Sequence, residues 1–159
     1  MSEIKSLAFR VDFEETMRMI VTYANLFAVS APPPSRGIII RAFWDTGATN
    51  SVITPNIAQQ LMLSPIDSAR IVGVNSEGLA PVSLVHISLP NNVLLLSRRV
   101  TIAKIGEGAD MLIGMDIISL GDFLISNANQ KTSFSFVMPP FPVQPDWVER
   151  SNQINNGII

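Results

Sequence analysis

The run Asp45-Thr46-Gly47-Ala48 is the part of this 159-residue sequence that is best suited to do chemistry. It follows the apolar run 38–44 and precedes a second apolar stretch at 51–53. A carboxylate in a glycine-containing turn at the end of a buried strand is costly, because burying a lone charge is strongly unfavourable. Chains accept that cost mainly where a carboxyl group reacts, so we predict that Asp45 is catalytic.

Other reactive groups are scarce in this chain. Cysteine is absent and His86 is the only histidine, which excludes thiolate metal sites and disfavours a histidine-based metal site or a serine–histidine relay. We therefore expect no metal and no cofactor. The formal net charge of −2 provides no basic surface for nucleic acid or anionic lipid, so we expect neither as a partner.

The composition is apolar for one domain of this length. Hydrophobic residues make up 47% and charged residues 15%, which indicates a large core or a surface that a partner covers. The apolar stretch 17–31 is interrupted by Arg18 and Asn25. These interruptions argue against a secretory signal and against a membrane-spanning helix, so we expect a cytoplasmic protein.

The remaining sequence predicts an all-β fold with one or two short helices. Alternating and β-branched apolar runs predict strands at 7–13, 17–29, 37–44, 67–74, 79–89, 93–105, 111–113, 123–126 and 132–137, although a helix over 17–29 stays open. Thr54 and Pro55 have the residue types of an N-cap and a first helical position, predicting a helix over 56–61, and a second is expected over 115–120. We divide the chain into an N-terminal extension of extra strands (1–35), a main domain (36–138) and a poorly ordered, Pro- and Asn-rich tail (139–159).

Three features stand in a particular order along the main domain. The Asp45-Thr46-Gly47-Ala48 run is followed by a hairpin with a polar tip, and then by Leu112-Ile113-Gly114 and a short helix. This order resembles the retropepsin-like (retroviral-type) aspartic proteases, over roughly residues 36–137. Met115-Asp116 after the glycine is closer to the cellular or bacterial members than to the retroviral ones, which usually carry arginine there.

The resemblance implies a retropepsin-like half-barrel that is only half of an enzyme. Aspartic proteolysis uses two carboxyls that share one proton, and Asp-Thr-Gly occurs once in this chain. The resemblance therefore implies a C2 homodimer in which two Asp45 carboxyls activate a water against a peptide bond. A peptide or protein is the expected substrate, with apolar residues preferred around the scissile bond.

The resemblance also implies roles for the residues around Asp45. The Thr46 hydroxyl would hydrogen-bond across the dimer axis, and Gly47 would permit the turn. Ile113 and Gly114 would support the catalytic loop from behind. Ala48 and Thr49 would contact substrate, together with a flap that contains Val74, Asn75, Ser76, Glu77 and Gly78.

Ala48 allows a further prediction about pH. Pepsin-like enzymes usually have serine or threonine at this position, where the hydroxyl donates to the catalytic carboxylate and favours its charged form. Alanine cannot donate, so we predict activity at mildly acidic to near-neutral pH.

Two other functions compete with the protease interpretation. One is a non-catalytic retropepsin-like module that dimerises or binds peptides. The other is a nucleotide-binding fragment, because the run 45–51 also resembles the first phosphate loop of actin-like ATPases, although that fold needs a much longer chain. We interpret Asp116 as a carboxylate that compensates the dipole of the short helix.

Overall fold

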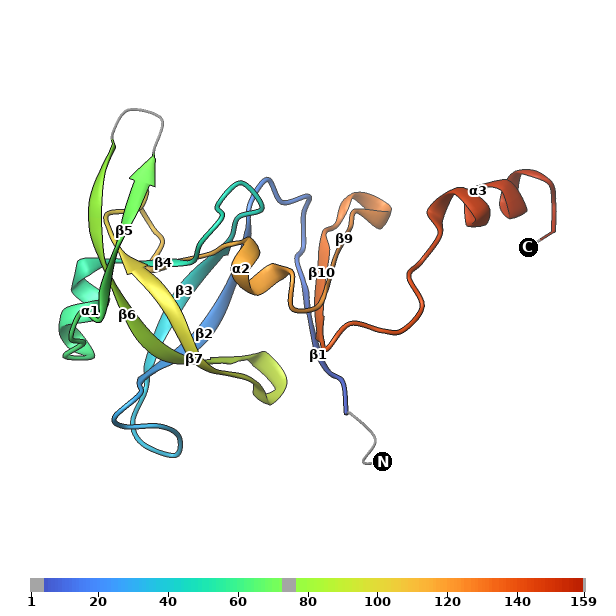
Figure 1. The fold of residues 1–159 in the computed structure, drawn as a ribbon. Helices are drawn as coiled ribbons and strands as arrows, with labels where there is room; N and C mark the ends of the chain where they lie inside the picture. Colours follow the sequence, from blue (N-terminus) through green and yellow to red (C-terminus); the bar gives the residue numbers. More distant parts are fainter. Residues whose placement is uncertain (1–4, 73–76, 159) are drawn as a thin grey trace.

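The computed structural model describes residues 5–72 and 77–158, and most of its regular structure is β (Figure 1). The ten strands of the described chain are β1 (Leu7–Asp12), β2 (Ile20–Ala28), β3 (Ile38–Trp44), β4 (Val52–Ile53), β5 (Asp67–Val72), β6 (Glu77–Leu89), β7 (Val93–Ile102), β8 (Met111–Ile113), β9 (Asp122–Ser126) and β10 (Ser133–Met138). Its α-helices are α1 (Pro55–Gln60), α2 (Met115–Ile118) and α3 (Trp147–Asn155). The all-β prediction is confirmed.

The larger sheet closes into a barrel within one chain. Its strand order is β2-β3-β8-β4-β7-β6-β5, and an additional pairing between β2 and β6 joins the two ends of the six-strand series from β2 to β6. We expected a half-barrel, whereas this pairing completes the ring in a single protomer. Strand β5 lies outside the ring and forms an antiparallel hairpin with β6.

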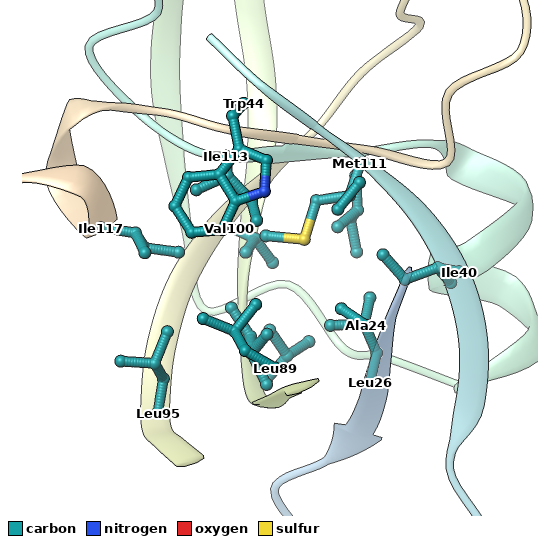
Figure 2. Close-up of a cluster of buried hydrophobic side chains, with 14 of the residues drawn as sticks. Ala24, Leu26, Ile40, Trp44, Leu89, Leu95, Val100, Met111, Ile113 and Ile117 are labelled. Atoms are coloured by element: carbon teal, nitrogen blue, oxygen red, sulfur yellow. The ribbon is translucent and has the colours of Figure 1, made fainter. Parts of the chain in front are cut away.

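The barrel is filled by aliphatic side chains from nearly every strand (Figure 2). Alternate residues of β2 and β3 point inward, as the period of two in a strand requires. Leu26, Ile40, Met111 and Ile113 are all at most 1% exposed. Each such side chain contributes about 1.5–3 kcal/mol on burial, so the core is sufficient to hold the strands around the site in one arrangement.

The smaller sheet has three strands in the order β1-β10-β9 and packs against the end of β3. Its inner face carries phenylalanines that surround Trp44, with ring centroids between 4.9 and 6.1 Å from the indole (Phe9, Phe123, Phe134 and Phe136). The buried indole N–H of Trp44 donates to Thr22 Oγ1 at 2.9 Å. Because Trp44 directly precedes Asp45, this packing fixes where the candidate catalytic loop begins.

The N-terminal 35 residues contribute β1 and β2. β1 pairs with β10, and β2 pairs with both β3 and β6. Residues 20–28 form one strand, which settles the helix alternative for that stretch. The extension is therefore part of both sheets, because without it neither the barrel nor the three-stranded sheet would be complete.

The tail differs from our prediction of poor order, because residues 147–155 form α3. The Asp146 carboxylate accepts the N–H of Glu149 at 2.9 Å, which is the capping arrangement that starts a helix. The sequence Asp-Trp-Val-Glu carries this helix-capping signal, whereas the surrounding prolines and asparagines favour the prediction of poor order. No helix in residues 5–72 and 77–158 is long and apolar enough to cross a membrane.

Candidate active site

Asp45 sits in the turn between β3 and β4, the two strands that flank β8 in the larger sheet. β8 lies between β3, to which it is parallel, and β4, to which it is antiparallel. The Asp45 N–H donates to the Ile113 carbonyl at 2.9 Å, and the Ala48 N–H donates to the Asp45 carbonyl at 3.2 Å. The half-buried Asp45 carboxylate accepts the Gly47 N–H on Oδ1 at 2.8 Å. The carboxylate is therefore oriented by its own turn and still reaches the surface.

Gly114 lies directly behind this turn and is needed there for reasons of space. A Cβ at this position would lie 2.7 Å from the Asn50 carbonyl carbon and 2.8 Å from the Ala48 carbonyl oxygen. Both are backbone atoms, so they could move aside only if the loop itself moved. The next two N–H groups along the chain hold the loop in place: that of Met115 donates to the Ala48 carbonyl and that of Asp116 to the Thr49 carbonyl, at 2.8 and 3.1 Å.

A buried hydroxyl provides a second connection between the loop and α2. Ser51 is fully buried, donates to Asp116 Oδ1 at 2.8 Å and accepts the Gly114 N–H at 3.0 Å. We interpreted Asp116 only as a helix-dipole residue, and the structure adds this specific partner. In the sequence, the one signal for this contact is the position of Asp116, two residues after Gly114.

Asp45 and Thr46 line a cavity of about 380 Å³. Its other walls are mostly apolar. Phe43 and Trp44 directly precede Asp45, and the rest come from segments far away in the sequence (Arg18, Met19, Ile20, Leu112, Phe123 and Ile125). None of these was predicted as a site residue. Those far from Asp45 in the chain reach it because β2 and β8 pair with β3, and because Phe123 of β9 packs against Trp44. Arg18 is the one cationic side chain in this set.

Among the described residues, the other predicted site residues do not line the Asp45 cavity. Gly47 and Thr49 are exposed and Ala48 is half-buried, and none of the three lines the cavity. Glu77 and Gly78 are on β6, paired with Val72 and Ile71 of β5, so the expected hairpin is present up to its tip. The remaining flap residues Val74, Asn75 and Ser76 lie outside the described residues.

Within the part of the chain that the structure describes, no three histidine, cysteine, aspartate or glutamate side chains lie close enough together to hold a metal ion. The Asp45 carboxylate accepts the Gly47 N–H, and the Asp116 carboxylate accepts the Ser51 hydroxyl.

The family is decided by a sequence comparison that covers this site. The family model described as aspartyl protease matches residues 36–117, which is just over half of the chain and runs from before β3 through α2. The chain belongs to the aspartyl protease family. A search of curated protein sequences finds no match to it.

Solved structures agree on the fold. A retropepsin-like aspartic protease from Rickettsia conorii superposes with a TM-score of 0.52 at 14% identity, covering 87% of this chain and 98% of that one. The EIAV protease complexed with the inhibitor HBY-793 has a TM-score of 0.47 at 19% identity, covering 64% of this chain and 86% of that one. The retroviral protease-like domain of Ddi1 from Leishmania major has a TM-score of 0.42 at 16% identity, covering 75% and 95%. The Rickettsia conorii structure, with its TM-score above 0.5, confirms the retropepsin-like fold that we expected.

Proposed function

We propose that this protein is an aspartic endopeptidase in which two Asp45 carboxyls, one from each subunit of a homodimer, activate the water that cleaves a peptide bond. The observation that carries the proposal is the Asp45 turn itself. In a member of the aspartyl protease family, it presents a carboxylate at the surface of a closely packed loop. Such rigidity suits catalysis, because reacting groups must be held within fractions of an ångström.

The second carboxyl must come from another copy of the chain, since Asp-Thr-Gly occurs only once. β9 supports this requirement. It is the outer strand of the three-stranded sheet, and among the described strands it pairs only with β10. Leu124 and Ile125 on this strand are each 42% exposed, and Ile125 lines the Asp45 cavity. An open, apolar strand edge beside the carboxylate is a surface that a second copy would cover.

The proposed reaction needs only the two carboxyls and water. The ionised carboxylate accepts a proton from the water as its oxygen attacks the peptide carbonyl carbon, while the protonated carboxyl donates a hydrogen bond to the carbonyl oxygen. The tetrahedral intermediate then collapses, the amine nitrogen takes a proton and the C–N bond breaks. The Gly47 N–H on Asp45 Oδ1 and the contacts behind the loop would keep both carboxyls in place throughout.

The β5–β6 hairpin fits the expected flap. β5 is the end strand of the larger sheet, and Val72 and Leu79, close to the hairpin tip, are 75% and 78% exposed. Apolar side chains in such a position are suited to contact an apolar peptide, and an extended peptide can pair with an open strand. A preference for apolar residues around the scissile bond follows from these side chains and from the apolar walls of the Asp45 cavity.

The test is cleavage of a proteome-derived peptide library at several pH values by the wild type and by Asp45→Asn. This variant keeps the size of the side chain and an oxygen that can accept the Gly47 N–H, so the loop is retained. We expect cuts by the wild type and none by the variant, with both proteins dimeric by sedimentation. Cuts that persist in the variant would refute the assignment of Asp45. A dimer that binds peptides and never cuts them would instead support a non-catalytic peptide-binding module.

A further inference from the structure

The C-terminal helix α3 lacks the packing that a helix of its length needs. It has nine residues, and none of them is buried. Isolated helices shorter than about 12–15 residues are marginal in water, and protein helices owe most of their stability to an apolar face that is packed. Capping by Asp146 and the Gln153–Glu149 side-chain bond at 3.1 Å favour the helix but do not replace such packing. Among the described residues, the packing around α3 therefore leaves its apolar side chains uncovered.

The face that needs covering is well defined. Trp147, Ser151 and Ile154 are spaced by four and three residues, which places them in one row along the helix. Trp147 is 61% exposed and Ile154 55% exposed, and they border a shallow hollow of about 210 Å³. A tryptophan and an isoleucine in one row, with only a serine between them, form a typical buried stripe of a helix at an interface.

The position of α3 indicates which surface covers this face. The Phe141 N–H donates to Asp122 Oδ2 at 2.9 Å, which ties the start of the arm, residues 139–158, to the start of β9. From there the arm runs away from the barrel, and α3 lies beyond β9, on the side away from the rest of the sheet (Figure 1). A second copy that covered the β9 edge would occupy that same side.

A cavity at the root of the arm continues towards the site. It measures about 670 Å³ and lies between the three-stranded sheet and the arm, with apolar walls from both (among them Ala8, Phe123, Leu124, Val137, Phe141 and Trp147). Phe123 also lines the Asp45 cavity, so the two hollows are adjacent. Since a C2 interface repeats every contact, an arm that crosses the axis finds the same apolar wall on the other subunit.

We propose that the arm is exchanged within the homodimer, with the Trp147–Ile154 row of α3 packed on the partner's three-stranded sheet. The inference rests on the proposed dimeric protease, and it adds a contact outside the catalytic loops. The exchanged arm lowers the dimer dissociation constant. At a given protein concentration, a larger fraction of the chains is therefore in complete, dimeric active sites.

The first measurement uses the two tryptophans of the full-length chain. Trp44 is already buried in the protomer, so the change in exposure on dimerisation is expected at Trp147, which is 61% exposed. As the concentration is raised through the dimer dissociation constant, we expect Trp147 emission to shift to the blue and its quenching by acrylamide to fall. The Trp147→Phe variant should lose this change. A Trp147 that stays equally quenched in monomer and dimer would overturn the proposal, and so would one that is shielded already in the monomer.

The second measurement is the dimer dissociation constant of the full-length double variant Trp147→Gln/Ile154→Gln. We expect it to rise by at least about tenfold, because buried tryptophan is a typical interface hot spot. Ile39→Gln/Met62→Gln is the matched control, since both are exposed apolar side chains. Ile39 lines a hollow with Gln60 and Leu61 at the end of α1, and Met62 follows directly after them. Helix α1 lies at the far end of the molecule from α3 (Figure 1). Equal constants for the two double variants would refute arm exchange.

The two proposals fail in different ways. If arm exchange is wrong and the protease is right, the double variant dimerises and cleaves peptides as the wild type does at every concentration. If the protease is wrong, the wild-type dimer cleaves nothing, whatever Trp147 reports. A chain that stays monomeric at all concentrations would overturn both.

Discussion

Ser51→Ala tests whether the buried hydroxyl holds the Asp45 loop on α2. The substitution removes two hydrogen bonds at once, the one that Ser51 donates to Asp116 and the one that it accepts from the Gly114 N–H. The Gly114 N–H is left buried without a partner, at a cost of about 1–3 kcal/mol. The half-buried Asp116 carboxylate can recover water, so its lost bond adds about 1 kcal/mol.

The expected loss of unfolding free energy is therefore about 2–4 kcal/mol by this reasoning. For a chain of this size each kcal/mol lowers the melting temperature by about 2–4 °C, so a fall of roughly 4–16 °C is expected. Thermal and urea unfolding at one fixed protein concentration measure it, because dimerisation makes stability depend on concentration.

The matched control is Ser119→Ala, which makes the same change in the same helix region. The exposed Ser119 hydroxyl donates to the Met115 carbonyl at 2.6 Å, and its removal should cost less than about 0.5 kcal/mol. If Ser51→Ala melts within the range of this control, the hydroxyl does not clamp the loop and the reasoning is wrong. In the proposed protease, Ser51→Ala should lower kcat by a larger factor than it raises KM, because the substitution disturbs the catalytic loop and not the contacts to substrate.

Three further predictions follow from single contacts. Ala48→Ser supplies a hydroxyl donor to the ionised catalytic carboxylate, so the acidic limb of the pH–rate profile should move to lower pH, and an unchanged profile would contradict the inference from alanine. Gly121→Ala would place a Cβ 2.0 Å from the Val137 carbonyl oxygen, and we expect a loss of at least about 3 kcal/mol in urea unfolding, whereas a wild-type midpoint would show that the turn can relax. The hydrogen bond from Arg99 lowers the pKa of Asp67, so this pair stabilises the fold above the unfolded-state pKa of Asp67 and stops doing so as the pH falls through the lowered one. Because both side chains are exposed the effect is small, and an NMR titration should show the Asp67 pKa rise in Arg99→Gln, while an unchanged value would mean that the pair is not formed in solution.

Much of the fold could be predicted because its signals are local. Thr54 and Pro55 start α1 as the cap and first position require, since a side-chain acceptor and a missing N–H satisfy the end of a helix within four residues. The alternation of apolar residues over 7–13 predicts a strand, and β1 forms at Leu7–Asp12, because the two faces of a strand differ in their surroundings. The α3 cap was equally local, but we gave more weight to the composition around it.

The wider site could not be predicted in the same way. Asp45 stood out because a carboxylate, a glycine and two flanking apolar runs are adjacent in sequence. Phe123 and Ile125 reach the same cavity from β9, and Arg18 reaches it from the bend before β2. No local pattern states that these segments lie close to the end of β3. The Ser51–Asp116 contact likewise joins residues that are 65 positions apart.

By itself, the sequence determined that the chain is mostly β. It also predicts that any proteolytic chemistry depends on Asp45, and that a single Asp-Thr-Gly leaves an aspartic protease site half-built. These conclusions depend only on residue types and their spacing over a few positions. Only the tertiary structure decided that the barrel closes through β2 and β6, that Gly114 and Ser51 hold the loop, and that β9 and α3 present unpaired surfaces on one side. Each of these depends on contacts between segments far apart in the chain, where packing of the whole core selects one arrangement among many that the local patterns allow.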